Sequence, residues 1–395
     1  MPAATVSPTS VLVDDSDPLL GELAQVPIAP RAIVDALATI PDPRDRRGRV
    51  HPLPEILTIA ATAAIAGQRS FTGIGDWSAD AGPQVLTAMG SACTVVPSES
   101  TIRRGLQRID GDRFDAIINT WMRLSFTTIG QRQIVAVDGK TIRGAVDADG
   151  NAPHLLAAMD HRSGAVIGQV RVGPKTNEIP KLIDLLDPID ITAMVITIDA
   201  MHTQKATADY ITGHGGHFVM TVKANQPTLY QQCKALPWKT IGVLDRTTDT
   251  GRGRRITRTI SATEVPAGFD FPHIGQVIKI GRTVTCKKKR TTEIAYLITD
   301  LAMLDAQPQQ IAAWVRGHWR IENQLHYVRD VTYGEDASRI RVGNGPRVMA
   351  TLRNLAIAIG RNAGHTNIAA AARHAARHPE RAIKLLLTSH VRTLP

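Results

Sequence analysis

The chain has 395 residues, of which 43% are hydrophobic, enough to bury a core in two or three packed units. Its 46 Lys and Arg against 36 Asp and Glu give a formal net charge of +10, which favours a polyanionic partner such as nucleic acid. Three widely spaced cysteines, Cys93, Cys233 and Cys286, exclude a disulfide framework and a cysteine zinc site, and they fit a reducing cytoplasm. The longest apolar run, residues 56–67, is too short to cross a bilayer, so we expect a buried helix and no membrane partner.

The N-terminal third of the chain reads as helical. Residues 1–28 are rich in Pro, Ser, Thr and Asp, which predicts a mobile tail, and residues 29–130 predict a helical domain that binds DNA. Near its end, PSESTIRRGLQRID predicts an amphipathic helix with Ile102 and Leu106 on one face and Arg103 and Arg104 on others. This helix either reads DNA as the second helix of a helix-turn-helix or only packs against its neighbours.

The middle of the chain has a more specific order of elements. Strands are predicted at residues 134–138, 154–160, 165–172, 195–199 and 217–223, with helices at 176–186 and 203–214. The order β-β-β-α-β-α-β is typical of an RNase H-like fold, in which parallel strands extend a three-strand meander through helical crossovers. We therefore expect an α/β protein with an RNase H-like mixed sheet and C-terminal helices over residues 131–365.

Two later segments depart from this pattern. Thr- and Arg-rich sequence containing RTTDTGRGRRITRTI and CKKKRTTEIAYLITD predicts a β-rich insertion at about residues 228–304, after which a helical pattern resumes at Pro308. Residues 337–395 hold ten Lys or Arg against one acid, Glu380, at helix-like intervals, which predicts helices with a basic face. Residues 366–395 are expected to form a basic helical C-terminal segment. The basic residues of these helices either contact phosphates or only form a solvent-exposed helix face.

Two aspartates occupy equivalent places in the predicted sheet. Asp138 ends the apolar strand of IVAVD and Asp199 ends that of VITID, on strands expected to be neighbours. Either one alone is an ordinary turn residue, but two carboxylates meeting at one edge favour a divalent cation between them.

A third carboxylate is expected from the later helix. The α-helical periodicity of that segment predicts a stripe of residues that faces inward and includes Glu322. The alternative role of Glu322 is a salt bridge to a neighbouring arginine. The nearby acids Asp330, Glu335 and Asp336 are expected to be structural. The stripe consists of Ile311, Val315, His318, Glu322, Leu325 and Arg329.

Four segments together resemble a known family. VDGKTIRGA, TIDAMHTQ, FVMTVKANQPTLY and HWRIENQLHYVRDVTYGEDASRIR resemble the ISAs-type insertion-sequence transposases, also called H-repeat-associated proteins, over residues 30–365. The resemblance implies a bacterial DDE transposase with Asp138, Asp199 and Glu322 as its three acids and a β-rich insertion between the last two. Wider relatives place the glutamate in a Tyr, Arg, Glu, Lys signature. The corresponding positions here are Val315, His318, Glu322 and Arg329, so only the glutamate matches.

The resemblance also implies a mechanism and partners. Two Mg²⁺ ions held by the three acids, with Mn²⁺ as a substitute, would support DNA cleavage at the transposon ends and transfer of the 3′ hydroxyl to target DNA. The partners would be double-stranded DNA, as terminal inverted repeats and target, and a second copy of the chain on DNA, in the bacterial cytoplasm at the nucleoid. The alternatives are an RNase H-like nuclease that does not transpose and an inactive DNA-binding derivative.

Ten residues are expected to contact DNA. Three of them follow the last strand of the core, Lys223, Asn225 and Gln226, and have capping of that strand as an alternative role. The full set is Arg103, Arg104, Lys140, Lys223, Asn225, Gln226, His318, Arg329, Arg339 and Arg341.

Overall fold

The computed structural model describes residues 33–47, 49–88, 95–126, 132–174, 176–251, 253–287 and 289–389. The predicted tail at residues 1–28, Cys93 and the last six residues of the predicted basic segment lie outside them. Within the described part of the chain, no helix combines the length and apolar character needed to span a membrane.

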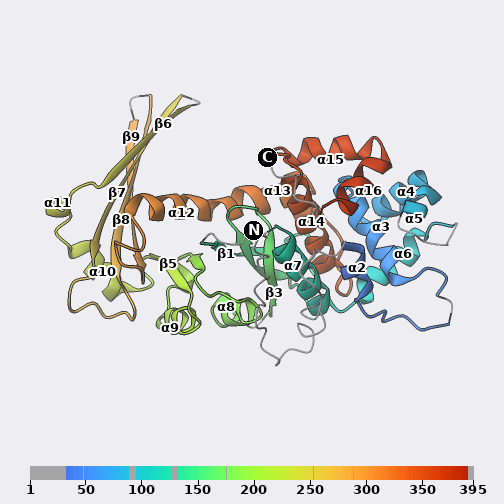
Figure 1. Ribbon diagram of the computed structural model, residues 1–395, viewed down its shortest axis with the longest axis horizontal. Coiled ribbons are helices and arrows are strands. Elements are labelled where there is room, and N and C mark those ends of the chain that lie inside the picture. Colours follow the sequence, from blue (N-terminus) through green and yellow to red (C-terminus); the bar gives the residue numbers. More distant parts are fainter. Residues whose placement is uncertain are drawn as a thin grey trace, which may run out of the picture.

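A mixed sheet of nine strands, ordered β3-β2-β1-β4-β5-β9-β8-β7-β6, organises the molecule (Figure 1). β2 pairs antiparallel with β1 and β3, whereas β4 runs parallel to both β1 and β5. The β-β-β-α-β-α-β order predicted from the sequence is therefore present. Its elements are β1 (Ile134–Thr141), β2 (His154–Asp160), β3 (Val166–Val172), α8 (Glu178–Leu186), β4 (Val195–Ile198), α9 (Lys205–Gly213) and β5 (His217–Val222).

The segment after β5 extends the same sheet. β9 pairs antiparallel with β5, and β8, β7 and β6 follow outward in antiparallel order. Two helices precede these strands, so the segment is less purely β than its sequence suggests. The outer ends of the strands project beyond α11 and α12 (Figure 1). The elements are α10 (Pro227–Ala235), α11 (Trp238–Ile241), β6 (Asp245–Gly251), β7 (Arg254–Glu264), β8 (Gln276–Cys286) and β9 (Lys289–Thr299).

Helices from the two ends of the chain share one hydrophobic core. α14 packs against both α3 and α7, and α16 packs against α3. The apolar run predicted to be a buried helix is α3, which is buried along nearly its whole length. The N-terminal helices are α2 (Ile33–Ala38), α3 (Leu53–Ile65), α4 (Phe71–Ala81), α5 (Pro83–Ala88), α6 (Glu99–Arg108) and α7 (Gly111–Phe126).

The C-terminal elements begin with a helix that crosses the sheet. α12 packs against β1, β4 and β7, and it runs in Figure 1 from the projecting strands to the C-terminal helices. The elements are α12 (Pro308–Arg320), η2 (Ile321–His326), α13 (Tyr327–Val331), η3 (Glu335–Ala337), α14 (Gly345–Asn362), α15 (Ile368–Ala376) and α16 (Pro379–Leu387).

Part of the predicted basic face is turned into the protein. The Arg347 guanidinium lies 2.6 Å from Asp115 Oδ2, and that of Arg353 lies 2.8 Å from Glu335 Oε1. A guanidinium removed from water requires such an anionic partner, and charge spacing along a helix does not reveal it. Arg361 likewise donates to the backbone carbonyl of Gln324. The exposed basic residues that remain on α15 and α16 include Arg373, Arg377 and Lys384.

Candidate metal centre

Asp138 lies within β1, which continues to Thr141 beyond the strand end predicted at residue 138, and Asp199 directly follows the neighbouring parallel strand β4. The register pairs Ala136 of β1 with Thr197 of β4, and continuing it by two residues sets Asp138 opposite Asp199. Neighbouring strands lie about 4.8 Å apart, and paired residues face the same side of the sheet. The side chains of the two aspartates belong to different groups of contacts, so their meeting at one metal ion stays a prediction.

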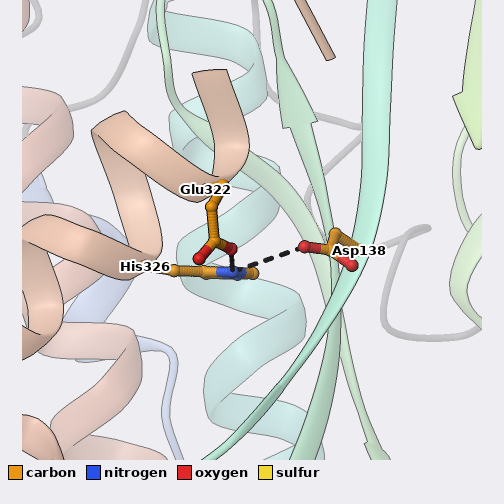
Figure 2. A group of neighbouring side chains, drawn as sticks. All are labelled: Asp138, Glu322 and His326. Carbon is orange, nitrogen blue, oxygen red and sulfur yellow. Dashed lines mark hydrogen bonds and ion pairs between the residues drawn. The ribbon is translucent and has the colours of Figure 1, made fainter. Parts of the chain in front are cut away.

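Three side chains converge at this edge. Asp138, Glu322 and His326 each offer a ligand atom, and these atoms all lie within 4.8 Å of one another. His326 Nδ1 lies 3.2 Å from Glu322 Oε2 and 3.5 Å from Asp138 Oδ2. Figure 2 shows the imidazole from the helix lying between the carboxylate of the same helix and that of β1.

A π-helical turn, η2, carries Glu322 and His326. Its wider turn changes the angular step locally at Glu322, whereas Leu325 and Arg329, further along the predicted stripe, are both buried. The prediction that Glu322 faces inward is wrong, since its side chain is 59% exposed. His326, which the sequence analysis did not select, is buried beside it. The available signal was the spacing of an acid and a histidine four residues apart on a helix.

Burial and neighbouring carboxylates disfavour the charged form of Asp138 in this cluster when no cation is bound. Burial raises the pKa of Asp138 above its ordinary value, and the nearby Glu178 and Glu322 raise it further, against the lowering effect of His326. The hydrogen bond with His326 lowers the pKa of Glu322. A cation between the carboxylates would stabilise both in their charged forms.

The ligand atoms suit a small divalent cation. Adjacent ligands of an octahedral ion with bonds of 2.0–2.1 Å lie about 3 Å apart, close to the 3.2 and 3.5 Å separations around His326 Nδ1. Carboxylate oxygens suit Mg²⁺ and Mn²⁺, and an imidazole nitrogen is a ligand more typical of transition metals.

Asp199 stands apart from the three-residue cluster. Its Oδ1 accepts a hydrogen bond from the Met201 amide at 2.9 Å and caps the short helix η1 (Ala200–His202). The amide groups of Asn225 and Gln226 hold the same loop, because they donate to the carbonyls of Ala200 and Thr203 at 2.6 and 2.8 Å. Asn225 and Gln226 thus bond to the loop after β4 and not to the end of β5, which differs from the capping role considered for them.

Three residues expected at DNA are instead bound within the protein. The Lys140 ammonium is 9% exposed and lies 2.7 Å from Asp330 Oδ2. Arg329 is fully buried and paired with Glu335 at 2.8 Å. His318 Nδ1 lies 3.1 Å from the Thr197 hydroxyl under α12. Their roles in this structure are to join the helix to the sheet and to the core.

The other expected DNA contacts lie on the surface. Arg103 and Arg339, far apart in sequence, line one groove between α6 and the segment around η3. Arg104, Lys223 and Arg341 are exposed. The apolar side of α6 is buried, as an amphipathic packing helix requires, so the helix has both a packed face and a basic one.

A second polar network lies next to Asp138. Glu178 Oε1 lies 2.6 Å from His154 Nε2, and its Oε2 lies 3.1 Å from His202 Nε2. Burial would raise the pKa of Glu178, but the two histidines lower it to about 2. A Cβ atom at Gly139 would lie 2.2 Å from Glu178 Oε1, so a larger residue there would displace this side chain. The network ties β2 and α8 to η1, and the sequence analysis missed it because its members are far apart along the chain.

His161 should make stability depend on pH. Burial lowers the pKa of this imidazole from 6.5 to about 3, with His318 and Arg320 adding to the effect. The folded protein disfavours protonation of His161, whereas the unfolded chain protonates it below pH 6.5. The contribution of neutral His161 to the free energy of unfolding is therefore complete above pH 6.5 and is lost as the pH falls towards about 3. We expect the free energy of unfolding to fall by up to about 1.4 kcal/mol per pH unit in this window, and the His161→Asn variant to show a shallower fall. Urea unfolding across the window tests this, and equal slopes in both proteins would contradict it.

The comparisons with known proteins agree with these features. Residues 129–359 match the family model described as the transposase DDE domain, and residues 34–122 match the model described as DDE_Tnp_1-associated. The Escherichia coli protein named "Putative transposase YncI" is 31% identical over 83% of this chain and 86% of its own length. The Escherichia coli protein named "H repeat-associated putative transposase YhhI" is 28% identical over 83% of this chain and 90% of its own.

A solved structure of the piggyBac transposase synaptic complex with hairpin DNA aligns with a TM-score of 0.41 and 11% identity, over 92% of this chain and 80% of that one. A likeness at this level carries no argument about fold or function. The family match over residues 129–359 does, and the chain therefore belongs to the DDE transposase family, with H repeat-associated proteins among its relatives.

Proposed function

We propose that the chain cleaves DNA at the ends of an insertion sequence and joins the freed 3′ hydroxyl to target DNA. The convergence of Asp138, Glu322 and His326 at the edge of the sheet, in a chain of the DDE transposase family, carries the proposal. Asp199, which directly follows the neighbouring strand β4, would supply the third acid. In this proposal the strands β1 to β5 are an RNase H-like core.

The metal would be Mg²⁺, with two ions expected and Mn²⁺ as a substitute. Asp138, Asp199 and Glu322 would hold it, and the separations around His326 Nδ1 add this nitrogen as a candidate ligand. When bound, divalent cations supply the positive charge that activates an attacking oxygen and stabilises a leaving oxygen at phosphorus.

The protein's own residues position that chemistry. The bond from Lys140 to Asp330 ties β1 to the helix after Glu322, and the amides of Asn225 and Gln226 hold the loop after Asp199. In the first reaction, water attacks the phosphorus and the 3′ oxygen of the transposon end leaves as a hydroxyl. In the second, that hydroxyl attacks a target phosphate and displaces the target's own 3′ oxygen.

We propose double-stranded DNA as the partner, as terminal inverted repeats and as target, with two copies of the chain on the paired ends, at the bacterial nucleoid. The helices at residues 29–130 would form a DNA-binding domain beside a catalytic domain at residues 131–365. The groove that Arg103 and Arg339 line is the candidate contact of the first domain. The exposed residues Arg104, Lys223 and Arg341 are further candidates.

An excision assay with the native flanking DNA tests the function. We expect strand cleavage at the element ends only with Mg²⁺ or Mn²⁺ present, followed by joining to a target plasmid. Asp199→Asn should lose both products and keep end binding, because the amide preserves shape but removes the charge. Cleavage without joining would indicate a nuclease that does not transpose, and binding without cleavage an inactive derivative.

A further inference from the structure

The outer half of strands β6 to β9, residues 246–258 and 282–293, carries a concentration of positive charge. These segments contain ten Lys or Arg against two acids, Asp249 and Glu293, in a chain whose net charge is +10. Of the ten, Arg252 and Lys288 lie outside the described residues. We call this outer half the β-arm.

The base of the sheet is covered on both faces, and the β-arm continues past the covers. On one face Ile260, Ile278 and Leu297 pack in a cluster with residues of α12. On the other, Tyr296 packs against Trp238 of α11 and Tyr230 of α10. The helices that bury the base do not reach the outer ends of the strands (Figure 1).

Strand register divides the β-arm into two chemically different faces. Side chains alternate between faces along a strand, and residues paired across strands share a face. One face consists of three rows across the sheet and contains no acidic residue. We call it the Thr/Arg face, and its rows are Thr250, Arg255, Thr285 and Arg290; Thr248, Thr257, Thr283 and Thr292; and Arg246, Thr259, Gly281 and Ile294.

Both acids lie on the opposite face, and each has an arginine partner there. Asp249 pairs with Arg258, and Glu293 lies 3.0 Å from Arg282. The arginines of the Thr/Arg face therefore have no carboxylate on their own face within the β-arm. Arg246, Arg255 and Arg290 are all exposed.

The chemistry of this face matches a nucleic-acid backbone. Arg255 and Arg290 flank Thr285 in one row, two strand spacings or about 10 Å apart, and so can reach separate phosphates. In the pairs Thr248 with Thr257 and Thr283 with Thr292, hydroxyl oxygens lie 3.2 and 3.0 Å apart. One hydroxyl in each pair donates to the other, whose own proton stays free to donate to a phosphate oxygen.

A protein partner is disfavoured by the same composition. Protein interfaces bury an apolar centre rich in aromatic residues, whereas the apolar member of these rows is Ile294 alone among threonines, arginines and a glycine. We propose that the Thr/Arg face of the β-arm binds the phosphate backbone of duplex DNA. The inference rests on the proposed function only in taking DNA as the partner.

The test is the salt dependence of duplex binding by the full chain. The triple variant Arg246→Gln, Arg255→Gln, Arg290→Gln should lower the slope of log affinity against log salt by about 2.7, at about 0.9 for each phosphate contact. The matched control Arg254→Gln, Lys287→Gln, Lys289→Gln removes three exposed charges from the opposite face and the turn. It should lower the slope by less than about 0.9.

Several outcomes would overturn the inference. An equal decrease of the slope in both triple variants would show a general effect of charge and no specific binding face. An unchanged slope in the first variant would also overturn it. A change in the oligomeric state of the DNA-free protein, without a change of slope, would make the face a protein interface. Thermal unfolding should be unaltered because all six positions are exposed, and the single variants Arg255→Gln and Arg290→Gln should each lose about 0.9 of slope. DNA cleavage is measured separately from binding. A chain that binds DNA through this face but does not cleave it would refute the proposed function and leave this inference intact.

Discussion

Asn in place of Asp138, or Gln in place of Glu322, should lower DNA cleavage by at least about a thousand-fold, beyond the 10–100-fold typical of residues that only support a metal ligand. Each carboxylate offers an oxygen to a group of three ligand atoms that all lie within 4.8 Å of one another, and an amide cannot supply the charge that would hold an ion there. Cleavage of end DNA in Mg²⁺ measures the loss. Titration with Mn²⁺, followed by electron paramagnetic resonance, measures ion binding independently.

The control for these variants is Asp149→Asn, which removes one exposed carboxylate from a turn. It should cleave at the parent rate. Normal cleavage and normal Mn²⁺ binding in Asp138→Asn would remove this aspartate from the site, and the same result in Glu322→Gln would require another third acid.

Gln in place of Glu335 should act on stability, with an expected loss of about 3–5 kcal/mol in the free energy of unfolding. Glu335 is fully buried, and its two oxygens each lie 2.8 Å from the guanidinium of Arg329 or Arg353. Burial alone would raise its pKa, but the two arginines lower it below the ordinary value. The amide leaves both buried guanidinium groups without a counter-charge. The stabilisation is therefore present above the ordinary pKa of 4.5 and lost as the pH falls through the lower folded value.

Urea unfolding of Glu335→Gln and Glu322→Gln side by side separates the two roles. Glu322 is largely exposed, so its variant should unfold close to the parent midpoint while losing cleavage. A Glu335→Gln protein of parent stability that no longer cleaves would move the third acid to the segment after Gly334.

The sequence predicts much of the sheet because apolar runs and turn signals are local. The predicted strand at residues 154–160 coincides with β2, whereas β1 extends three residues past Asp138, where its apolar run ends. Glu322 came from the family resemblance combined with helix spacing, and that spacing gave the wrong burial. A π-turn depends on tertiary contacts and leaves no periodic signal of its own.

Charge was harder to interpret because a pattern of arginines does not reveal their partners. Arg329 and Arg353 share Glu335, and Arg347 pairs with Asp115, more than two hundred residues earlier. Arg347 and Arg353 were expected on a basic helical surface and Arg329 at DNA, and all three are buried. The β-arm shows the converse, since its clusters RGRR and KKKR were treated only as strand sequence, although their described members, such as Arg255 and Arg290, are exposed.

The core shared by the two ends of the chain also sets an order of events during synthesis. The helices before Phe126 leave the ribosome first, yet their core is completed only by residues that begin with Ile321 and end with Leu386. At a translation rate of about 5–20 residues per second, the faces of α3 and α7 that α14 and α16 cover stay uncovered for about 10–50 s. The nascent N-terminal segment therefore reaches its final packing only when the chain is almost complete, after every residue of the metal centre has already been made.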